Sequence, residues 1–381
     1  MEETMKYTST LLASEPTTQE VRKADLDLLK KINEQADRID TNSQSIISTD
    51  KTVSALPVVG ANYLINSNFN RWDYATSQTS SGYGSDNRWS NENTGTTKTH
   101  SQQPSGDTER ALFSSPYYSR TAITSVAGVG NFCNKLQRIE DVTKLAGKTI
   151  TLSFWAKADS SKNIAIEFRQ NGGTGGFAAL TASPQKIALT NTWQKITRTI
   201  TLPSIIGKTL GTLNTSFTTM LIWFDAGSNF NVNTDSLGQQ SGTFDIAEVK
   251  IEEGTVATPW CGYSGEFGGE VEACARYLPA FLGNSNNFIG MANTTTSAYI
   301  TVPFNTTTRI APTGITVSLA SHFNNLDIIA VNSASSAIAF DSSGKNSALI
   351  NSTGAGFTVG RPTWIRANTA LASLIFTGAE L

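Results

Sequence analysis

The sequence predicts a mainly all-β protein in which an N-terminal coiled-coil helix precedes a jelly-roll β-sandwich and a small C-terminal β domain. Three observations lead to this prediction. Charged residues make up only 16% of the chain, and Ser, Thr, Asn and Gly replace them, which favours strands and turns over charged helices. Short apolar segments alternate with turn-rich segments over most of the length. One early segment instead repeats its apolar residues every seven positions.

Length and charge limit the classes of protein to consider. The 381 residues exceed one ordinary domain and indicate two or three. The net charge is −2 and the isoelectric point is near 5.8. Because phosphate backbones bind basic surfaces, we expect no nucleic-acid partner. Residues 1–16, MEETMKYTSTLLASEP, carry acids and no apolar stretch, so we expect no signal peptide and synthesis in a cytoplasm. The sequence contains no run of ~18 apolar residues, so we expect no membrane insertion.

Residues 1–16 are interpreted as an attachment segment, and residues 17–56 as a coiled-coil helix. From Thr17 to Ser54 the chain is rich in charge and contains no Gly or Pro. Its apolar residues follow a heptad seam that weakens toward the end of the segment. The seam residues, which we expect to drive trimerisation, are Leu29, Ile32, Ala36, Ile39, Ile46 and Val53. The alternative is one amphipathic helix lying on a neighbouring domain, and the seam itself does not decide between two strands and three.

After a linker at residues 57–61 the period changes from seven to two. Residues 62–262 are interpreted as the jelly-roll sandwich, because short strands separated by turn residues, without alternating helices, are typical of that class. Five strands are predicted there, at Lys148–Ala158, Asn163–Gln170, Trp193–Leu202, Thr218–Ala226 and Thr243–Glu253.

The crowded stretch NYLINSNFNRWDYATS at residues 62–77 is interpreted first as part of the fold. We expect Leu64, Ile65 and Phe69 to begin the first strand, and Trp72 to cover one edge of the sandwich. The polar residues between them would cap the turn.

Residues 263–381 are interpreted as a separate C-terminal β domain. GEVEACARYLPAF, at residues 269–281, predicts a short helix, and several strands rich in Ala, Ser and Thr follow it. Because small side chains bury little apolar area, we expect few large core residues and a reliance on neighbouring subunits.

The residues for catalysis or for a cofactor are missing. The three cysteines, Cys133, Cys261 and Cys274, have no metal-binding spacing, so we expect buried or free thiols rather than a Cys261–Cys274 disulfide. His100 and His322 are the two histidines, too few for an ordinary metal or nucleophilic site. No cofactor is expected.

Glycoside hydrolysis requires two carboxylates facing each other, and the acids here have no visible partner. We expect each of the six candidates to be a surface charge: Asp86, Asp107, Glu252, Glu253, Asp327 and Asp341. The chain also lacks the G-x-S-x-G and H-E-x-x-H motifs. It is therefore not expected to be an enzyme.

Sugar binding is better supported, because aromatic rings cover the apolar face of a sugar while neutral polar groups pair its hydroxyls. The carbohydrate-contacting residues predicted from turn-rich segments are Tyr83, Tyr117 and Tyr118. Trp72 and Trp89 are expected to pack inside. The tryptophans in predicted strands, expected to be core or sandwich cover, are Trp155, Trp193 and Trp223.

Several stretches together resemble the jelly-roll region of tail-fibre proteins of tailed bacteriophages. They are NYLINSNFNRWDYATS, LQRIEDVTKLAGKTITLSFWAKADSSKNIAIEFRQNGGTGG and LGQQSGTFDIAEVKIEEGTVATPW, with GEVEACARYL and the final FTGAEL behind them. The resemblance covers roughly residues 62–381. It implies a homotrimer whose N-terminus docks on tail or baseplate proteins, and a domain like a carbohydrate-binding module. The location implied is the virion, after synthesis in the host cytoplasm.

Related sugar-binding jelly rolls often hold a structural calcium ion. Ala247 stands where such proteins carry an Asp in a late strand, and Asn70 stands where an early acid is common. No calcium site is therefore carried over to this chain.

The expected function is that of a trimeric tail fibre that binds a polysaccharide of the host surface without cutting it. One alternative is a baseplate-proximal connector whose β domains pack on other virion proteins. A second alternative, weaker because no acid pair is visible, is a polysaccharide depolymerase.

Overall fold

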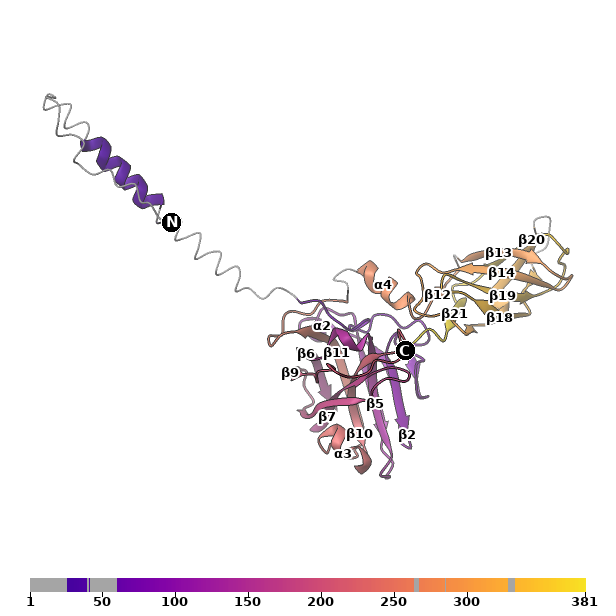
Figure 1. Cartoon of the computed structure of the whole chain (residues 1–381). Helices are drawn as coiled ribbons and strands as arrows, with labels where there is room; N and C mark the ends of the chain where they lie inside the picture. Colours follow the sequence, from indigo (N-terminus) through magenta and orange to yellow (C-terminus); the bar gives the residue numbers. More distant parts are fainter. Residues whose placement is uncertain (1–25, 40, 42–59, 264–266, 285, 328–332) are drawn as a thin grey trace. The chain divides into compact units, whose positions relative to one another are not determined.

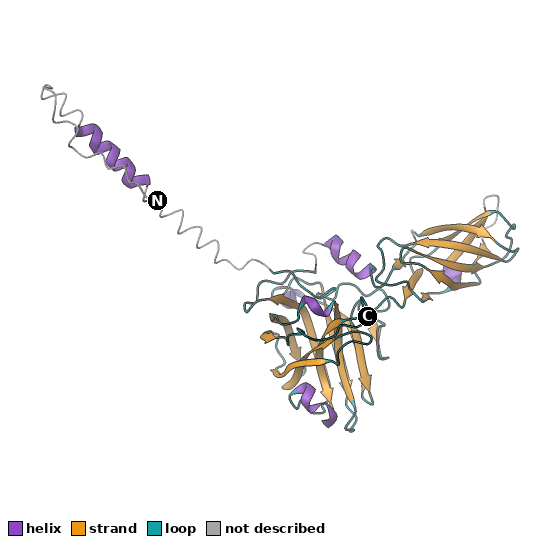
Figure 2. Cartoon of the chain, in the orientation of Figure 1, coloured by secondary structure: helices purple, strands orange, loops and turns teal. Residues whose placement is uncertain are grey.

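The computed structural model describes residues 26–39, 41, 60–263, 267–284, 286–327 and 333–381. The chain divides into two compact units, residues 1–58 and residues 59–381. Strands dominate the described part of the second unit, and helices are few and short (Figures 1 and 2).

The first unit contains a helix at residues 26–39 and 41. Ile32 is 43% exposed and Ile39 is 67% exposed, so two seam residues face solvent in the single chain. The helix confirms that part of the expectation, whereas its self-association stays a prediction. The seam residues Ile46 and Val53 lie outside the described residues.

The second unit begins with two antiparallel sheets. The first has six strands, in the order β1 (Ser77–Gln78), β3 (Thr97–Pro104), β4 (Tyr117–Thr124), β11 (Gly242–Glu253), β6 (Thr149–Ala158) and β9 (Gln194–Thr201). The second has five, in the order β2 (Ser90–Thr94), β5 (Phe132–Glu140), β10 (Phe217–Ala226), β7 (Lys162–Asn171) and β8 (Leu180–Leu189). Short helical segments join them: α2 (Asp107–Arg110), η2 (Val142–Lys144), η3 (Ser228–Phe230) and α3 (Asn231–Thr234).

The strand order is that of a jelly roll. From β4 to β11, every connection except the β7–β8 hairpin crosses from one sheet to the other. The labelled strands β2, β5, β10 and β7 lie side by side in Figure 1. Apolar residues from both sheets fill the space between them, including the fully buried rings of Phe154, Phe168, Phe224 and Phe244.

The five strands predicted in this region are confirmed as β6, β7, β9, β10 and β11, with small shifts at their ends. Trp193 falls just before β9 rather than inside it. β2 (SNENT) and β3 (TKTHSQQP) are not among the predicted strands, because their polar residues resemble a loop until they pair with β5 and β4.

The prediction that a strand starts at Leu64, Ile65 and Phe69 is wrong. These residues are buried, but none lies in a strand: Ile65 is in a turn at residues 65–68, and Leu64 and Phe69 flank that turn. Asn66 and Phe69 have positive φ angles of 52° and 57°, and a strand needs extended backbone. Nδ2 of Asn66 donates to the carbonyls of Arg71, at 2.8 Å, and Asn87, at 3.0 Å. An asparagine that bonds nearby backbone in this way competes with strand pairing.

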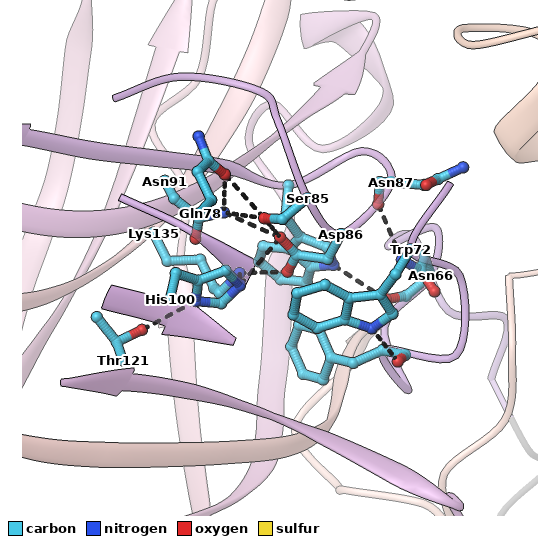
Figure 3. Close-up of polar contacts among 12 residues, drawn as sticks. Asn66, Trp72, Gln78, Ser85, Asp86, Asn87, Asn91, His100, Thr121 and Lys135 are labelled. Carbon is cyan, nitrogen blue, oxygen red and sulfur yellow. Dashed lines mark hydrogen bonds and ion pairs between the residues drawn. The ribbon is translucent and has the colours of Figure 1, made fainter. Parts of the chain in front are cut away.

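A polar network lies between the sheets without access to solvent (Figure 3). The carboxylate of Asp86 accepts a hydrogen bond from Nζ of Lys135, and it lies 3.1 Å from Nε2 of His100. The other ring nitrogen of His100 lies 3.2 Å from Oγ1 of Thr121. The indole ring of Trp72 stacks on the imidazole, with ring centroids 5.2 Å apart. Strands β3, β4 and β5 are thereby joined to the loop that carries Asp86.

Charge in this network is set by burial and by the partners. Burial opposes ionisation of Asp86, but Lys135 and His100 outweigh it and hold the pKa of the carboxyl well below its usual range. Burial, helped by the charge of Lys135, lowers the pKa of His100 from 6.5 to about 4. At neutral pH the network therefore holds an ion pair and a neutral imidazole.

Residues 280–377 form a second pair of antiparallel sheets. One has three strands, β12 (Ala280–Leu282), β21 (Ser373–Thr377) and β15 (Gly314–Val317). The other has seven, β17 (Ser333–Ala334), β16 (Phe323–Asp327), β20 (Pro362–Ala367), β13 (Asn287–Ala292), β14 (Ser297–Pro303), β19 (Ser347–Thr353) and β18 (Ala337–Ser343). The predicted short helix is α4 (Phe267–Ala275), which precedes them, and η4 (Ala320–His322) lies before β16.

The expectation of few large core residues here is wrong. The core of this second sandwich contains five buried phenylalanines, Phe281, Phe288, Phe323, Phe357 and Phe376. They stand singly among small residues in the sequence, so their convergence is visible only after the strands pair.

The last residues of the chain are bound by arginines. Arg88, from the loop before β2, forms a buried ion pair with Glu380. Arg138 donates to the backbone oxygen of Leu381. Arg309 donates to the carbonyls of Ala379, at 3.0 Å, and Glu380, at 2.6 Å. Residues 379–381, which follow β21, are thereby tied to the first sandwich.

Acidification should destabilise the first sandwich through His100. An unfolded histidine takes up its proton near pH 6.5, whereas folded His100 does so only at about 4. Between these values the unfolded state binds more protons, so the free energy of unfolding falls as the pH is lowered. Urea unfolding followed by tryptophan fluorescence should show a loss of roughly 2 kcal/mol between pH 7 and pH 5. Asp86 adds its own loss only below its unfolded pKa of 3.8.

His100→Gln should remove most of this pH dependence. His322→Gln, the matched control in the second sandwich, should leave it in place. An equal slope in His100→Gln and the unaltered protein would contradict the assignment.

Glu380→Ala should lower the free energy of unfolding by ~3 kcal/mol, because it leaves the buried guanidinium of Arg88 without its ion-pair partner. Faster trypsin cleavage between the two sandwiches should accompany this loss. Glu272→Ala, which removes an exposed carboxylate from α4, is the control and should stay within ~0.5 kcal/mol. Equal urea midpoints for the two variants would mean that the ion pair contributes nothing.

Candidate functional site

The outer face of the six-stranded sheet carries a groove of about 500 Å³. One wall is the loop that follows α2, with Phe113 and Ser114, and the opposite wall is the segment after β11 that ends in Trp260. The floor consists of Trp155 and Lys195, which lie opposite each other on β6 and β9.

Strand alternation places these residues outside. Phe154 points into the core, so its neighbour Trp155 points to the outer face. Ala247 lies opposite Trp155 on β11, and its small side chain leaves room on this face for the rings of Phe113 and Tyr118, which pack in one cluster with it. The floor is therefore a consequence of strand register and one small residue.

Aromatic rings support the groove from one side. Phe113 lies 6.3 Å from Trp155 and 5.0 Å, edge to face, from Trp193. Tyr118 packs edge-on against Trp193 at 5.2 Å. Nζ of Lys195 lies 5.8 Å from the centre of the Trp155 ring. These contacts hold Trp155 and Phe113 in defined positions, half-buried and buried respectively.

Glu248 supplies an oriented acceptor. It occupies an irregularity of β11, with φ at 45°. Its Oε1 accepts from the backbone N–H of Ser114 at 2.7 Å, from the hydroxyl of Ser114 at 2.8 Å and from the N–H of Ser115 at 3.1 Å. Within the described residues Oε2 has no hydrogen-bond partner, so that oxygen is available to a ligand.

The second wall is fixed by buried charge. Nζ of Lys250 donates to Oγ1 of Thr258 at 2.5 Å and to the carbonyl of Pro259 at 2.9 Å, and it lies 3.1 Å from the Glu252 carboxylate. Glu252 in turn accepts from the N–H of Thr258 at 2.8 Å. These bonds hold the chain that leads to Trp260. The described residues contain no group of three or more His, Cys, Asp or Glu side chains able to hold a metal ion.

Two of the acids expected at the surface, Asp86 and Glu252, are instead fully buried in ion pairs with Lys135 and Lys250. The expectation failed because burial depends on what the fold packs around a pair: Lys250 and Glu252 are two residues apart on β11 and are covered together, and Asp86 lies in a loop that folds over Lys135 of β5. Asp107, Glu253 and Asp341 are exposed as expected, and the side chain of Asp327 lies outside the described set.

The described residues that line the groove include one carboxylate. Acid–base hydrolysis of a glycoside requires two facing carboxylates. Glu248 is the only carboxylate among the described residues that line this groove. Two further hollows also contain a single acid each, Glu140 in one and Asp159 in the other.

The three tyrosines predicted to contact sugar are not brought together. Tyr83 is half-buried, its hydroxyl donates to the Leu381 oxygen at 3.2 Å, and burial raises its pKa to about 12. Tyr117 is 37% exposed at the start of β4. Tyr118 is buried, contrary to the expected exposure, and it supports the groove through Trp193.

Most of these tryptophans pack as expected, whereas Trp155 lines the groove. Trp89 is fully buried and Trp72 packs against the core, as predicted. Trp223 is buried on the outer face of the five-stranded sheet, under Phe230 and Leu237. That segment therefore closes one end of the opposite outer face. Trp155 lines the groove, which its alternation with Phe154 in FWAKA could have indicated.

Cys133, Cys261 and Cys274 are free, as expected, and burial raises the pKa of Cys133 to about 12. Among the described helices, none has the length and apolar character needed to cross a membrane.

Comparison with known proteins found no matching family model and no matching curated protein. Solved structures show a distant likeness. A family 4 carbohydrate-binding module shares 17% identity over 50% of this chain and 98% of its own, with a TM-score of 0.30. A family 11 module from Clostridium thermocellum, solved with a β-1,3-1,4-mixed-linked tetrasaccharide, shares 11% over 48% and 98%, with a TM-score of 0.31.

A third likeness is to the enzymatically active domain of tailspike protein 4 from bacteriophage CBA120. It shares 15% identity over 51% of this chain but only 21% of the tailspike chain, with a TM-score of 0.30. At such scores these likenesses add nothing to the argument from residues and contacts.

Removing calcium should not affect stability, because the described residues bring together no group of three or more His, Cys, Asp or Glu side chains that could hold the ion. We expect equal thermal midpoints in EDTA and in millimolar calcium. Lys250→Met should lower the midpoint, since it leaves Glu252 buried without a cation, whereas Lys208→Met at an exposed position should not. A rise of the unaltered protein's midpoint on adding calcium would contradict this.

Proposed function

We propose that this chain binds a glycan through the groove and does not cleave it. The supporting observation is the combination of the Trp155 and Trp260 side chains with Lys195 and the unpartnered Oε2 of Glu248 in one groove. Aromatic surface covers the C–H face of a pyranose ring, while a fixed carboxylate oxygen accepts from its hydroxyls.

We further propose that the protein is a trimeric tail fibre of a bacteriophage. The support is the resemblance of residues 62–381 to such fibres and the heptad seam. In the helix the seam consists of Leu29, Ile32, Ala36 and Ile39. Such a seam predicts self-association, and the resemblance to tail fibres supplies the number of three chains.

A trimer would make weak sugar sites effective. Three grooves on one fibre, and several fibres on one particle, raise avidity without requiring tight binding at any single groove. In this proposal the N-terminal segment docks on tail or baseplate proteins and the β domains meet the host surface.

Binding should be measured on an array of bacterial surface glycans, followed by calorimetry with the strongest one. We expect Trp155→Ala and Trp260→Ala each to weaken binding at least tenfold, about 1.4 kcal/mol, because each removes one aromatic contact surface. Lys195→Ala should also weaken binding, and Lys208→Ala, an exposed lysine elsewhere, should not.

The same glycan should yield no new reducing ends during long incubation with the protein. Unchanged affinity in both tryptophan variants with intact thermal midpoints would overturn the groove assignment. New reducing ends would overturn the non-catalytic part.

The solution mass from light scattering should be about three times the chain mass of 40.8 kDa. Ile32→Asp combined with Ile39→Asp should reduce it to that of one chain, because the charges would be buried in the seam. Lys30→Asp, outside the seam, is the control. A solution mass of one chain for the unaltered protein would contradict the proposed trimer.

A further inference from the structure

The seven-stranded sheet of the second sandwich has an unusual outer face. Along β20, residues alternate between the core and solvent, so Ile365 is buried while Trp364 is 45% exposed. On the adjacent β13, Phe288 is in the core and Ile289 is 56% exposed. The outer face of such a sheet is ordinarily polar, so an exposed tryptophan beside an exposed isoleucine needs an explanation.

Strand register arranges these residues in two neighbouring rows across β16, β20 and β13. The apolar row consists of Leu326, Trp364 and Ile289. The polar row, two residues along each strand, consists of Asn324, Arg366 and Asn287. Side chains opposite each other on paired strands have Cβ atoms ~5 Å apart. The two rows therefore place a flat apolar surface directly beside a line of polar groups.

These residues line a hollow of about 410 Å³. Trp364, Ile289 and Leu326 contribute its apolar lining, and Arg366 and Asn287 contribute the polar groups. The volume lies within the range of small-ligand sites, which combine mainly apolar walls with a few placed polar groups.

Arg366 is the charged group of this hollow. Within the described residues its guanidinium has neither an ion pair nor a hydrogen bond, and the side chain of Asn287 likewise has no partner. An arginine offers a planar pair of N–H donors that matches a carboxylate. The charge complementarity of the site therefore favours an anionic ligand.

We propose that this hollow binds a carboxylate-bearing sugar, such as a uronic or sialic acid unit of a surface glycan. The indole of Trp364 would cover the C–H face of the ring, Arg366 would pair with the carboxylate, and Asn287 would bond a hydroxyl. This site is separate from the groove on the first sandwich and stands or falls independently of it.

A second copy of this chain is the other occupant to consider, because exposed apolar surface also marks subunit contacts. The unpaired arginine and the two asparagines in the polar row argue against it. A contact between identical sheets would bring the cationic rows of two copies together, without a carboxylate among the residues of the hollow to neutralise them.

The test is an array on which each glycan with a uronic or sialic acid is matched by its methyl-esterified form, probed with the full chain. We expect binding to the free acids to exceed binding to the esters at least tenfold and to weaken as salt is raised. Trp364→Ala and Arg366→Ala should each abolish this preference, and Arg366→Lys should restore only part of it.

Lys345→Ala, an exposed cation elsewhere in the second sandwich, is the matched control and should bind like the unaltered protein. Trp155→Ala should keep the preference for acids, which separates this site from the groove. The proposal is overturned if no acidic glycan is preferred over its ester. It is also overturned if Trp364→Ala changes the solution mass, since that outcome would assign the surface to subunit contact.

Discussion

Lys135 and Asp86, an ion pair with no access to solvent, attach the loop before β2 to the interior of the first sandwich. Asp86 lies in a loop, Lys135 lies on β5, and His100 joins them from β3. A buried ion pair adds little to stability by itself, yet removing one partner is costly because it leaves the other charged in a low-dielectric interior. The loop before β2 therefore has one position in which the Asp86 carboxylate meets its partners. With the loop in that position, Asn66 bonds to the carbonyl of Asn87 and Trp72 stacks on His100.

Buried ion pairs also hold the segment beside the groove and the last residues of the chain. Lys250 and Glu252 are buried beneath the second wall of the groove, and Arg88 and Glu380 are buried where the chain returns to the first sandwich. In each case a buried ion pair holds a segment without regular secondary structure, because separating the pair would leave an unpaired charge in the interior. The rigid part of the groove thus extends beyond the strands, so a ligand bound there would not have to order a loop, a step that would cost affinity.

Prediction from sequence succeeded for strands whose own apolar pattern is typical of a β-strand. β6, β7, β9, β10 and β11 alternate apolar residues with period two, and their ends were found almost to the residue. It failed where the signal belongs to a pair of strands. β3 carries no apolar signal because its buried residues are Lys98 and His100, and the five phenylalanines of the second core are scattered among small residues. The groove was missed for the same reason: Trp155 and Lys195 are forty residues apart, and only the β6–β9 register places them opposite each other.

The sequence by itself determined the β class, the helix at residues 26–39, the free thiols and the packing roles of Trp72 and Trp89. These depend on composition, periodicity and hydrophobicity, which are local properties of the chain. Tertiary structure decided which acids are buried, which tryptophans face solvent, and which residues share a groove. The burial of Asp86 and the exposure of Trp364 depend on which other segments pack against them. Strand pairing brings together residues that are far apart in the chain, so these contacts cannot be predicted from the local sequence.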